Sequence, residues 1–191
     1  MTIQCSTRWP EKMVSLKGEQ TVFVPQILNS LYHNGLITSD QITDYECKYY
    51  DITDLQFICS ERKKPHTIRA DKKNRWHAGR DIHFKIWQGV PYHSDTFQFA
   101  PVVKCISTQK ITIRWQFKGN EKVVYVNIWN DPEGNVKTFG YVNWINDKIV
   151  QQSYMVEQLA INDGFQSVDH FFRWFNKDFT GKLIHWTDLR Y

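Results

Sequence analysis

A hydrophobic period of two residues runs through the middle of the chain. Residues 82–87 alternate apolar and polar positions, and similar stretches rich in β-branched residues follow at 97–99, 102–117 and 123–129. Alternation of this kind is typical of half-buried strands. We therefore expect a sheet to dominate the middle of the molecule.

Turn residues separate these stretches in a way that favours antiparallel pairing. Residues 130–135 read Asn-Asp-Pro-Glu-Gly-Asn and precede another apolar run at 139–145, which predicts a hairpin. Asn146 and Asp147 offer a second turn before an apolar stretch at 148–150. The pattern predicts a curled antiparallel sheet or a small barrel.

Helical spacing flanks the predicted sheet on both sides. Residues 24–37 place apolar side chains on one face, with Pro25 in the first turn and Gly35 as a stop. Residues 154–161 also have helical spacing. Residues 38–56 are polar and acidic without a clean period, so we expect an irregular segment there with at most a short helix.

The C-terminal part combines one more helix with one more strand. Ser167 is a suitable N-cap for a helix that carries Val168, Phe171, Phe172 and Phe175 on one face. Gly181 then predicts a break, and residues 183–186 form a short last strand able to close the sheet. The expected class is α+β, a small antiparallel β-barrel flanked by helices. Residues 1–56 would form a helical extension packed on a barrel domain at 57–191.

Composition supports one compact domain. The chain has 191 residues, of which 41% are hydrophobic and 23% charged, so it can bury a core and does not resemble a disordered chain. It carries 8 Trp, 9 Tyr and 12 Phe, more rings than a minimal core needs. Some of these rings could form a stacking or recognition surface.

Several classes of site and location are disfavoured. The cysteines at 5, 47, 59 and 105 form no Cys-x-x-Cys pair, and the seven histidines show no ligand spacing, so we expect no metal site. Neither a signal peptide nor an apolar membrane segment is visible. The sequence also lacks phosphate-binding and dinucleotide fingerprints. We expect a reduced, cytoplasmic protein without a cofactor and without a membrane partner.

Charge is distributed unevenly along the chain. The net charge is +4, yet residues 62–90 hold nine basic side chains against two acidic ones, a local balance of +7. Residues 40–61 have a local balance of −5. Basic side chains interleaved with rings suit a phosphate-bearing ligand, because the cations neutralise phosphates while the rings stack on bases. A solvated charged surface explains the same pattern equally well.

Three short blocks resemble the ASCH domain family, which has a PUA-like fold associated with RNA. The first block, Lys64-Pro65-His66-Thr67-Ile68-Arg69, resembles the family signature, although Arg62 stands at its glycine position. A glycine-bearing turn into a strand follows at 75–82. The third block, Asp163-Gly164-Phe165 before a helix, is similar to the late Glu-Gly-Phe element of the family. The blocks occur in the family order and cover residues 57–186, and uncharacterised bacterial and phage proteins of this type look similar.

The resemblance implies a barrel with a cleft for RNA or a modified nucleoside. Some family members hydrolyse the acetyl group of acetylated cytidine with a Lys, a Thr and a Glu. Lys64 and Thr67 match the first two positions, and Asp163 matches the third with a side chain one methylene shorter. These three are the candidate catalytic residues.

Residue chemistry is compatible with that assignment. Thr67 needs a base to become a nucleophile, and a lysine whose pKa is lowered by burial and by Arg69 could take its proton. Thr67 and Arg69 share a face of an extended chain, whereas Lys64 must reach that face across the bend at Pro65. Purely structural roles remain open: a solvated lysine, a strand threonine, a structural arginine ion pair and a turn aspartate.

The candidate ligand-binding residues are Arg69, His66, Arg75 and Trp76. Arg69 could hold a phosphate or a base edge with its planar fork. His66 lies within the motif and could instead be a structural histidine, and Trp76 could be a core residue rather than a stacking platform.

Three functions follow from these patterns. The leading one is a binding protein for RNA or a modified nucleoside. The second is an amidohydrolase that removes an acyl group from acetylated cytidine or a related nucleoside. The third is a phage-type protein that acts through a protein partner, by means of residues 1–56.

Overall fold

The computed structural model of the protein describes residues 1–129 and 137–191, so the hairpin turn expected at 130–135 lies outside the described residues. The helices are the 3-10 helix η1 (Glu11–Leu16), α1 (Phe23–His33), α2 (Ser39–Thr53), α3 (Tyr154–Asn162) and α4 (Val168–Trp174). The strands are β1 (Thr2–Cys5), β2 (His66–Arg69), β3 (Asp81–Trp87), β4 (Thr96–Gln98), β5 (Val103–Lys104), β6 (Ser107–Lys118), β7 (Glu121–Trp129), β8 (Lys137–Ile145), β9 (Lys148–Gln152) and β10 (Phe179–His185).

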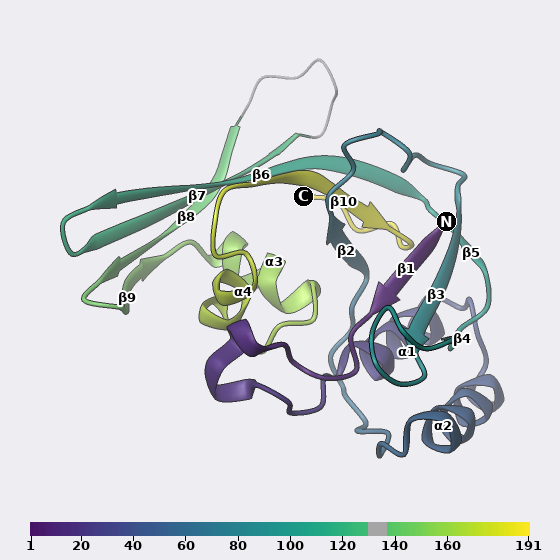
Figure 1. Ribbon diagram of the computed structural model, residues 1–191. Coiled ribbons are helices and arrows are strands. Elements are labelled where there is room, and N and C mark those ends of the chain that lie inside the picture. Colours follow the sequence, from purple (N-terminus) through teal and green to yellow (C-terminus); the bar gives the residue numbers. More distant parts are fainter. Residues whose placement is uncertain (130–136) are drawn as a thin grey trace.

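The strands form two sheets (Figure 1). The larger sheet has the order β2-β10-β6-β7-β8-β9, and all of its pairs are antiparallel. In the smaller sheet β3 pairs in parallel with β1 and antiparallel with β4 and β5. The α+β class and the predicted antiparallel strands are therefore confirmed.

A closed barrel is not confirmed, because both sheets are open. Within the described residues the edge strands β2 and β9 of the larger sheet do not pair with each other. The last strand, β10, lies inside that sheet between β2 and β6 instead of closing it. It begins at Phe179, so Gly181 lies within the strand and does not interrupt it. The stretch expected to run unbroken over 102–117 is divided, because β5 pairs with β3 in the other sheet.

Each sheet has its own hydrophobic core, and β10 contributes to both. Helices α3 and α4 cover one face of the larger sheet, where Leu183 packs with Ile113, Val126 and Phe171. Ile184 packs in the second core, which includes Ile27 of α1. Successive residues of a strand point to opposite faces, so one strand can join two cores.

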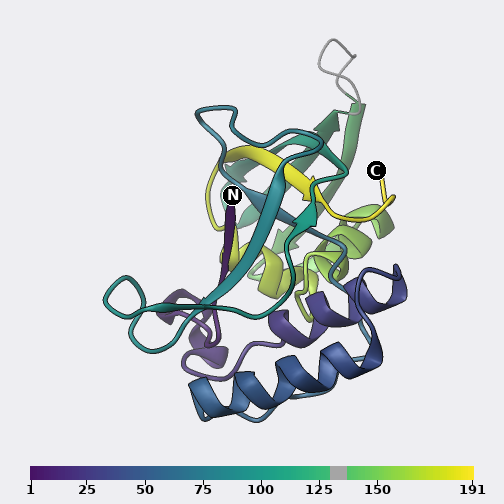
Figure 2. The same ribbon diagram turned by 90° about the vertical axis from the view of Figure 1, so that its right-hand side faces the viewer.

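The first 56 residues supply parts of this second core. Strand β1 forms the parallel pair with β3, and Val24, Leu28 and Leu31 of α1 are buried with Phe84. Figure 2 shows α1 and α2 side by side below the sheets. Residues 1–56 thus provide a strand as well as helices.

The segment expected to be irregular at 38–56 is mostly helical, which corrects that prediction. Helix α2 begins with a capping box in which the Thr38 side chain accepts from the Gln41 amide and the Gln41 side chain accepts from the Thr38 amide. The helix ends at Thr53, and its C-cap Asp54 adopts the left-handed conformation (φ 55°). Tyr49 is its one buried residue, so the helix is held by its caps and a narrow contact face rather than by a broad apolar stripe.

Among the described residues, the helices lack the combination of length and apolar character that a membrane crossing requires. The longest one, α2, is 15 residues long and rich in polar side chains.

Candidate functional site

The first motif block lies where α1 meets the edge of the larger sheet. The Lys64 amide donates to the Gln26 carbonyl of α1 at 3.0 Å, which fixes the chain just before β2. Strand β2 then pairs with β10, with Thr67 opposite Ile184 and Arg69 opposite Lys182. Thr67 and Arg69 line one cavity, and Lys64, which lies two residues before β2, lines the same cavity.

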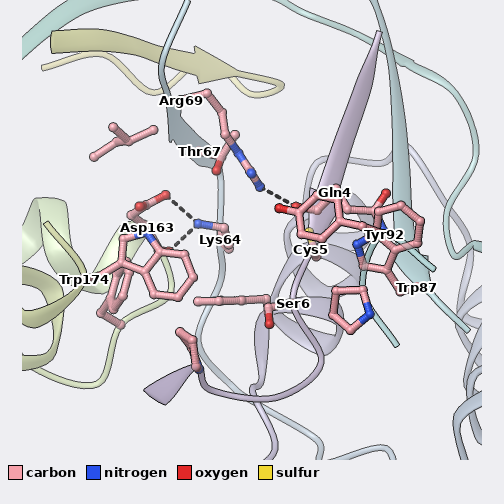
Figure 3. Close-up of a pocket in the computed structure, with 15 residues that line it drawn as sticks. Gln4, Cys5, Ser6, Lys64, Thr67, Arg69, Trp87, Tyr92, Asp163 and Trp174 are labelled. Carbon is pink, nitrogen blue, oxygen red and sulfur yellow. Dashed lines mark hydrogen bonds and ion pairs between the residues drawn. The ribbon is translucent and has the colours of Figure 1, made fainter. Parts of the chain in front are cut away.

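Lys64 and Asp163 form a buried ion pair in that cavity (Figure 3). The Lys64 Nζ lies 2.5 Å from the Asp163 Oδ1 and also donates to the Asp163 main-chain carbonyl. Both side chains are about 5% exposed. Asp163 is the C-cap of α3, and the Lys64 ammonium lies 5.2 Å from the centre of the Phe23 ring. The first and third sequence blocks therefore meet in space.

Gly164 explains why a glycine follows the aspartate. Its φ of +90° is a conformation that residues with a side chain rarely adopt. A Cβ at this position would lie 2.7 Å from the Gln26 Oε1 and 2.8 Å from the Phe23 ring. The glycine thus allows α3 to end against α1, which places Asp163 next to Lys64. Phe165 continues into the aromatic cluster around Trp9 and Phe23.

Burial sets the electrostatics of the pair. It lowers the pKa of Lys64 and raises the pKa of Asp163, while the attraction between the two groups opposes both shifts. Taking either charge out of water is costly, so each group is stabilised mainly by its partner. The nearby Arg69 lowers the pKa of both groups by a smaller amount. The proton between Lys64 and Asp163 is therefore less firmly held by the amine than it would be in solvent.

The cavity has a volume of about 340 Å³ and lies between β2 of the larger sheet and β1 and β3 of the smaller one. Besides the motif residues, its polar wall includes Gln4 and Ser6, with the thiol residue Cys5 between them. Its aromatic wall consists of Phe23, Trp87, Tyr92, Phe165 and Trp174. The cavity thus combines ring surfaces with a small number of polar groups.

Two rings mark the mouth of the cavity. Trp87 ends β3, and Tyr92 follows it in the loop to β4, with their ring centres 5.3 Å apart. Tyr92 is 85% exposed although it lines the cavity. Trp174, at the end of α4, is on the opposite side in Figure 3. A flat ligand that entered between these sides would cover apolar ring surface that is now exposed to water.

Arg69 is the cation of the cavity that has no acidic partner in the described residues. Its Nη2 donates to the Gln4 carbonyl at 2.8 Å, and its Nε is buried without a hydrogen-bond partner. No carboxylate of the described chain lies within 4.0 Å of it, so the structural alternative of an Arg69–Asp163 ion pair is not realised. Arg69 retains donors that an acceptor group in the cavity could use.

Thr67 is buried, and within residues 1–129 and 137–191 its hydroxyl makes no hydrogen bond. It is therefore not held in a particular rotamer by a partner. The hydroxyl lies in the same cavity as the Lys64 amine, without a direct hydrogen bond between them.

His66 lies outside the cavity wall and belongs to the buried layer behind it. Its Nε2 is 2.7 Å from the Tyr191 hydroxyl, and its Nδ1 is 3.8 Å from the Asp163 Oδ1. Burial, with the neighbouring His185 and Lys64, holds the pKa of His66 well below its usual range. His66 is thus a neutral neighbour of the Lys64–Asp163 pair.

Arg75 and Trp76 are not brought to the cavity. Arg75 is exposed in the segment between β2 and β3, whereas Trp76 is buried in the second core. The Asp71 carboxylate accepts from both of their amides and lies 3.4 Å from the Lys182 Nζ, which organises this segment separately. Of the nine basic residues at 62–90, Lys64 and Arg69 line the cavity.

Sequence reasoning missed the residues that β1 and the aromatic side chains contribute. Gln4 and Cys5 reach the cavity because β1 pairs in parallel with β3, about 80 residues away, and no local pattern reports such a pairing. For Trp87 and Tyr92, the aromatic residues on both sides of Gly89-Val90-Pro91 were an available signal. Trp174 follows the apolar stripe of α4 without any distinguishing feature.

Within the described residues, no cluster of three or more His, Cys, Asp or Glu is suitable for a metal ion. Comparison of the chain with protein-family models, with curated proteins and with solved structures found no match. The geometry of the cavity is therefore the guide to its function.

Proposed function

We propose that the protein binds RNA or a modified nucleoside, with one base in the cavity between Arg69 and the rings of Trp87, Tyr92 and Trp174. The observation that carries this proposal is the Arg69 guanidinium, which has an unpartnered buried donor beside a largely aromatic wall. A planar base offers both a ring face for stacking and acceptors for an arginine fork.

The size and polarity of the cavity support a small planar ligand. Its volume of about 340 Å³ falls at the lower end of the usual range for small-molecule sites. Such sites are mostly apolar, with a few placed polar groups that orient the ligand. Here Arg69, Thr67 and the Lys64–Asp163 pair would orient the base, and the rings would supply the contact area.

The buried ion pair supports a functional role for this end of the cavity. Buried charges are costly, and titratable groups with shifted pKa values that line a cavity are frequent at functional sites. The pair presents an ammonium donor and a carboxylate acceptor side by side, which matches the alternating donors and acceptors on the edge of a base.

Quenching of intrinsic tryptophan fluorescence tests the proposal, because two tryptophans line the cavity. The titrants would be cytidine, acetylated cytidine and a short single-stranded RNA, each at several salt concentrations. We expect saturable quenching that Arg69→Ala weakens and that Arg75→Ala, a matched change outside the cavity, leaves unchanged. Equal behaviour of the two variants, or no saturable quenching with any titrant, would contradict the proposal.

We propose the amidohydrolase as the second candidate, because Lys64, Thr67 and Asp163 line one cavity and burial lowers the pKa of the lysine. In this reaction Lys64 first passes a proton to Asp163, and the Thr67 oxygen then attacks the acyl carbon as the neutral Lys64 amine takes the hydroxyl proton. The carbon–nitrogen bond then breaks, and the released amine receives the proton from Lys64. Water hydrolyses the acyl-threonine, which frees the acid and restores the hydroxyl. Asp163 would hold Lys64 in position throughout.

Release of cytidine from acetylated cytidine would be followed by chromatography. We expect turnover that Thr67→Val and Lys64→Met abolish while Cys5→Ser retains it. Unchanged turnover in Thr67→Val would overturn the assigned nucleophile.

Membership of the ASCH family remains part of this proposal. The order of the three blocks and the meeting of Lys64, Thr67 and Asp163 in one cavity support it. The open sheets, the arginine at position 62 and the aspartate at position 163 are departures from the family pattern.

A further inference from the structure

Two further hollows along α4 share lining residues with the cavity and with each other. Trp174 lines both the cavity and a second hollow of about 530 Å³ beside Lys177. Lys12 and Asn176 line that hollow and also a third one, of about 490 Å³, which reaches Phe117. We call the second and third hollows together the α4 groove. Figure 1 shows α4 below the extended part of the larger sheet, with η1 as the purple coil next to it.

The carboxylates of the α4 groove are already paired. Asp178 accepts from the Trp115 amide at 2.9 Å and lies 3.9 Å from the Arg114 guanidinium. Asp169 pairs with Arg173, and Asp147 pairs with Lys122. Within the described residues, these contacts leave no carboxylate of the groove free to balance a further cation.

Lys12 and Lys177 are the unbalanced cations of the groove. Neither has a carboxylate within 4.0 Å in the part of the chain that the structure describes. Burial lowers the pKa of Lys12, and the nearby charge of Lys177 lowers it further. Because Lys12 and Lys177 repel each other and the nearby carboxylates are already paired, an anion bound between the two lysines would be stabilised.

Aromatic rings accompany these cations along the whole groove. The Lys12 ammonium lies 4.1 Å from the centre of the Trp174 ring and donates to the Trp174 carbonyl at 2.8 Å. At the far end, Phe117 is 66% exposed and stacks on Trp115, with ring centres 5.9 Å apart and planes 9° apart. Rings that alternate with cations in a groove are the pattern of single-strand nucleic-acid binding.

We propose that a single-stranded RNA chain leaves the cavity over Trp174 and runs along the α4 groove, with its phosphates at Lys12 and Lys177 and a later base on Phe117. This inference rests on the proposed function, since it extends the ligand whose base occupies the cavity. The inference also favours an RNA chain over a free nucleoside as the ligand, because a nucleoside would occupy only the cavity and leave the α4 groove empty. An acidic peptide would satisfy the lysines but would not use the exposed ring surface.

Fluorescence anisotropy with labelled, unstructured RNAs of about 2, 4, 6 and 8 nucleotides tests the proposal. We expect the affinity to rise with length and then level off. In Lys12→Ala/Lys177→Ala the longest RNA should bind about tenfold or more weakly, and the salt slope should fall by about 1.4, since each single-strand phosphate contact contributes about 0.7. The control is Lys72→Ala/Lys73→Ala, which removes the same charge from exposed positions outside the groove.

The outcomes separate this proposal from the one it extends. Affinity that does not depend on length, equal losses in both double variants, or equal competition by an oligoglutamate peptide would overturn the RNA path. Cytidine binding that persists in those cases, and that Arg69→Ala weakens, would leave the cavity proposal standing. Loss of length-dependent binding in Lys12→Ala/Lys177→Ala with unchanged cytidine binding would support the path.

Discussion

Lys64 and Asp163, 99 residues apart in the chain, form an ion pair in which both side chains are almost completely buried. Lys64 precedes the edge strand β2 and Asp163 ends α3, so the pair ties the larger sheet to the helices that cover it. The same two residues line the cavity. Stability and function are therefore expected to depend on one contact.

Removing the carboxylate should destabilise the protein strongly. We expect Asp163→Asn to lower the free energy of unfolding by about 3–5 kcal/mol, because a buried ammonium loses its partner charge. The control is Asp169→Asn, which breaks a half-exposed pair with Arg173 and should cost about 0–1 kcal/mol. Urea denaturation measures both values. A cost for Asp163→Asn no larger than that of the control would show that the pair is not structurally important.

Acid should destabilise the protein through two buried histidines. Burial lowers the pKa of His185 to about 3 and holds the pKa of His66 well below 6.5, so the folded state binds fewer protons than the unfolded state below pH 6.5. Stability therefore falls as the pH decreases from 6.5 toward 3, by about 1.4 kcal/mol per pH unit for each histidine that remains neutral.

Urea denaturation at about pH 5, 6 and 7 measures this slope. We expect His185→Gln to reduce it, whereas His33→Gln, a change at an exposed histidine, should leave it unchanged. If the change of unfolding free energy with pH were the same in His185→Gln, His33→Gln and the unmodified protein, the acid sensitivity would come from other groups.

Arg69 should matter for binding more than the more numerous lysines nearby. We expect Arg69→Lys to weaken binding of the base by about 1–3 kcal/mol, because an ammonium cannot reproduce a bidentate contact. Lys72→Ala, at an exposed position outside the cavity and the α4 groove, should cost less. Calorimetric titration combined with melting temperatures measures both effects. An equally stable Arg69→Lys variant with unchanged affinity would refute the ligand role.

Gly164 should be intolerant of any side chain. We expect Gly164→Ala to cost about 2–5 kcal/mol, which combines the backbone penalty with the overpacking of Gln26 and Phe23. Gly79→Ala is a matched control, since Gly79 also has a positive φ (+82°) but has open space around it. It should show the backbone penalty alone, about 1–2 kcal/mol. Equal losses of stability would show that the close approach to α1 is unimportant.

Local patterns predicted most of the strands and helices because those elements have one apolar face. The alternation at 82–87 corresponds to β3, and the cap at Ser167 begins α4 as expected. Helix α2 was underestimated because Tyr49 is its one buried residue, and its clearest signal was the capping pair Thr38 and Gln41. The position of β10 inside the sheet was not predictable, since strand order depends on contacts between distant segments.

For the candidate site, too, the sequence indicated residues that are close together in the chain and missed those that distant elements contribute. Lys64, Thr67 and Arg69 lie within six residues, and the resemblance to the ASCH blocks linked Asp163 to them. The structure brings all four to one cavity. Gln4, Trp87 and Trp174 come from three separate elements, so only the folded arrangement brings them to the cavity. His66, Arg75 and Trp76 were close in sequence to the motif, and closeness in sequence did not place them on the cavity wall.

The place of β10 between β2 and β6 also determines when the cavity can form. Strand β2 carries Thr67 and Arg69, and its sheet partner is a segment more than 110 residues later in the chain. Pairings across such a separation form late, because a long loop must close before any contact offsets its entropy. During synthesis, the edge of β2 that pairs with β10 therefore stays unpaired until β10 has been made. The part of the cavity wall that β2 forms thus depends on β10, and a chain interrupted before Phe179 would lack this pairing.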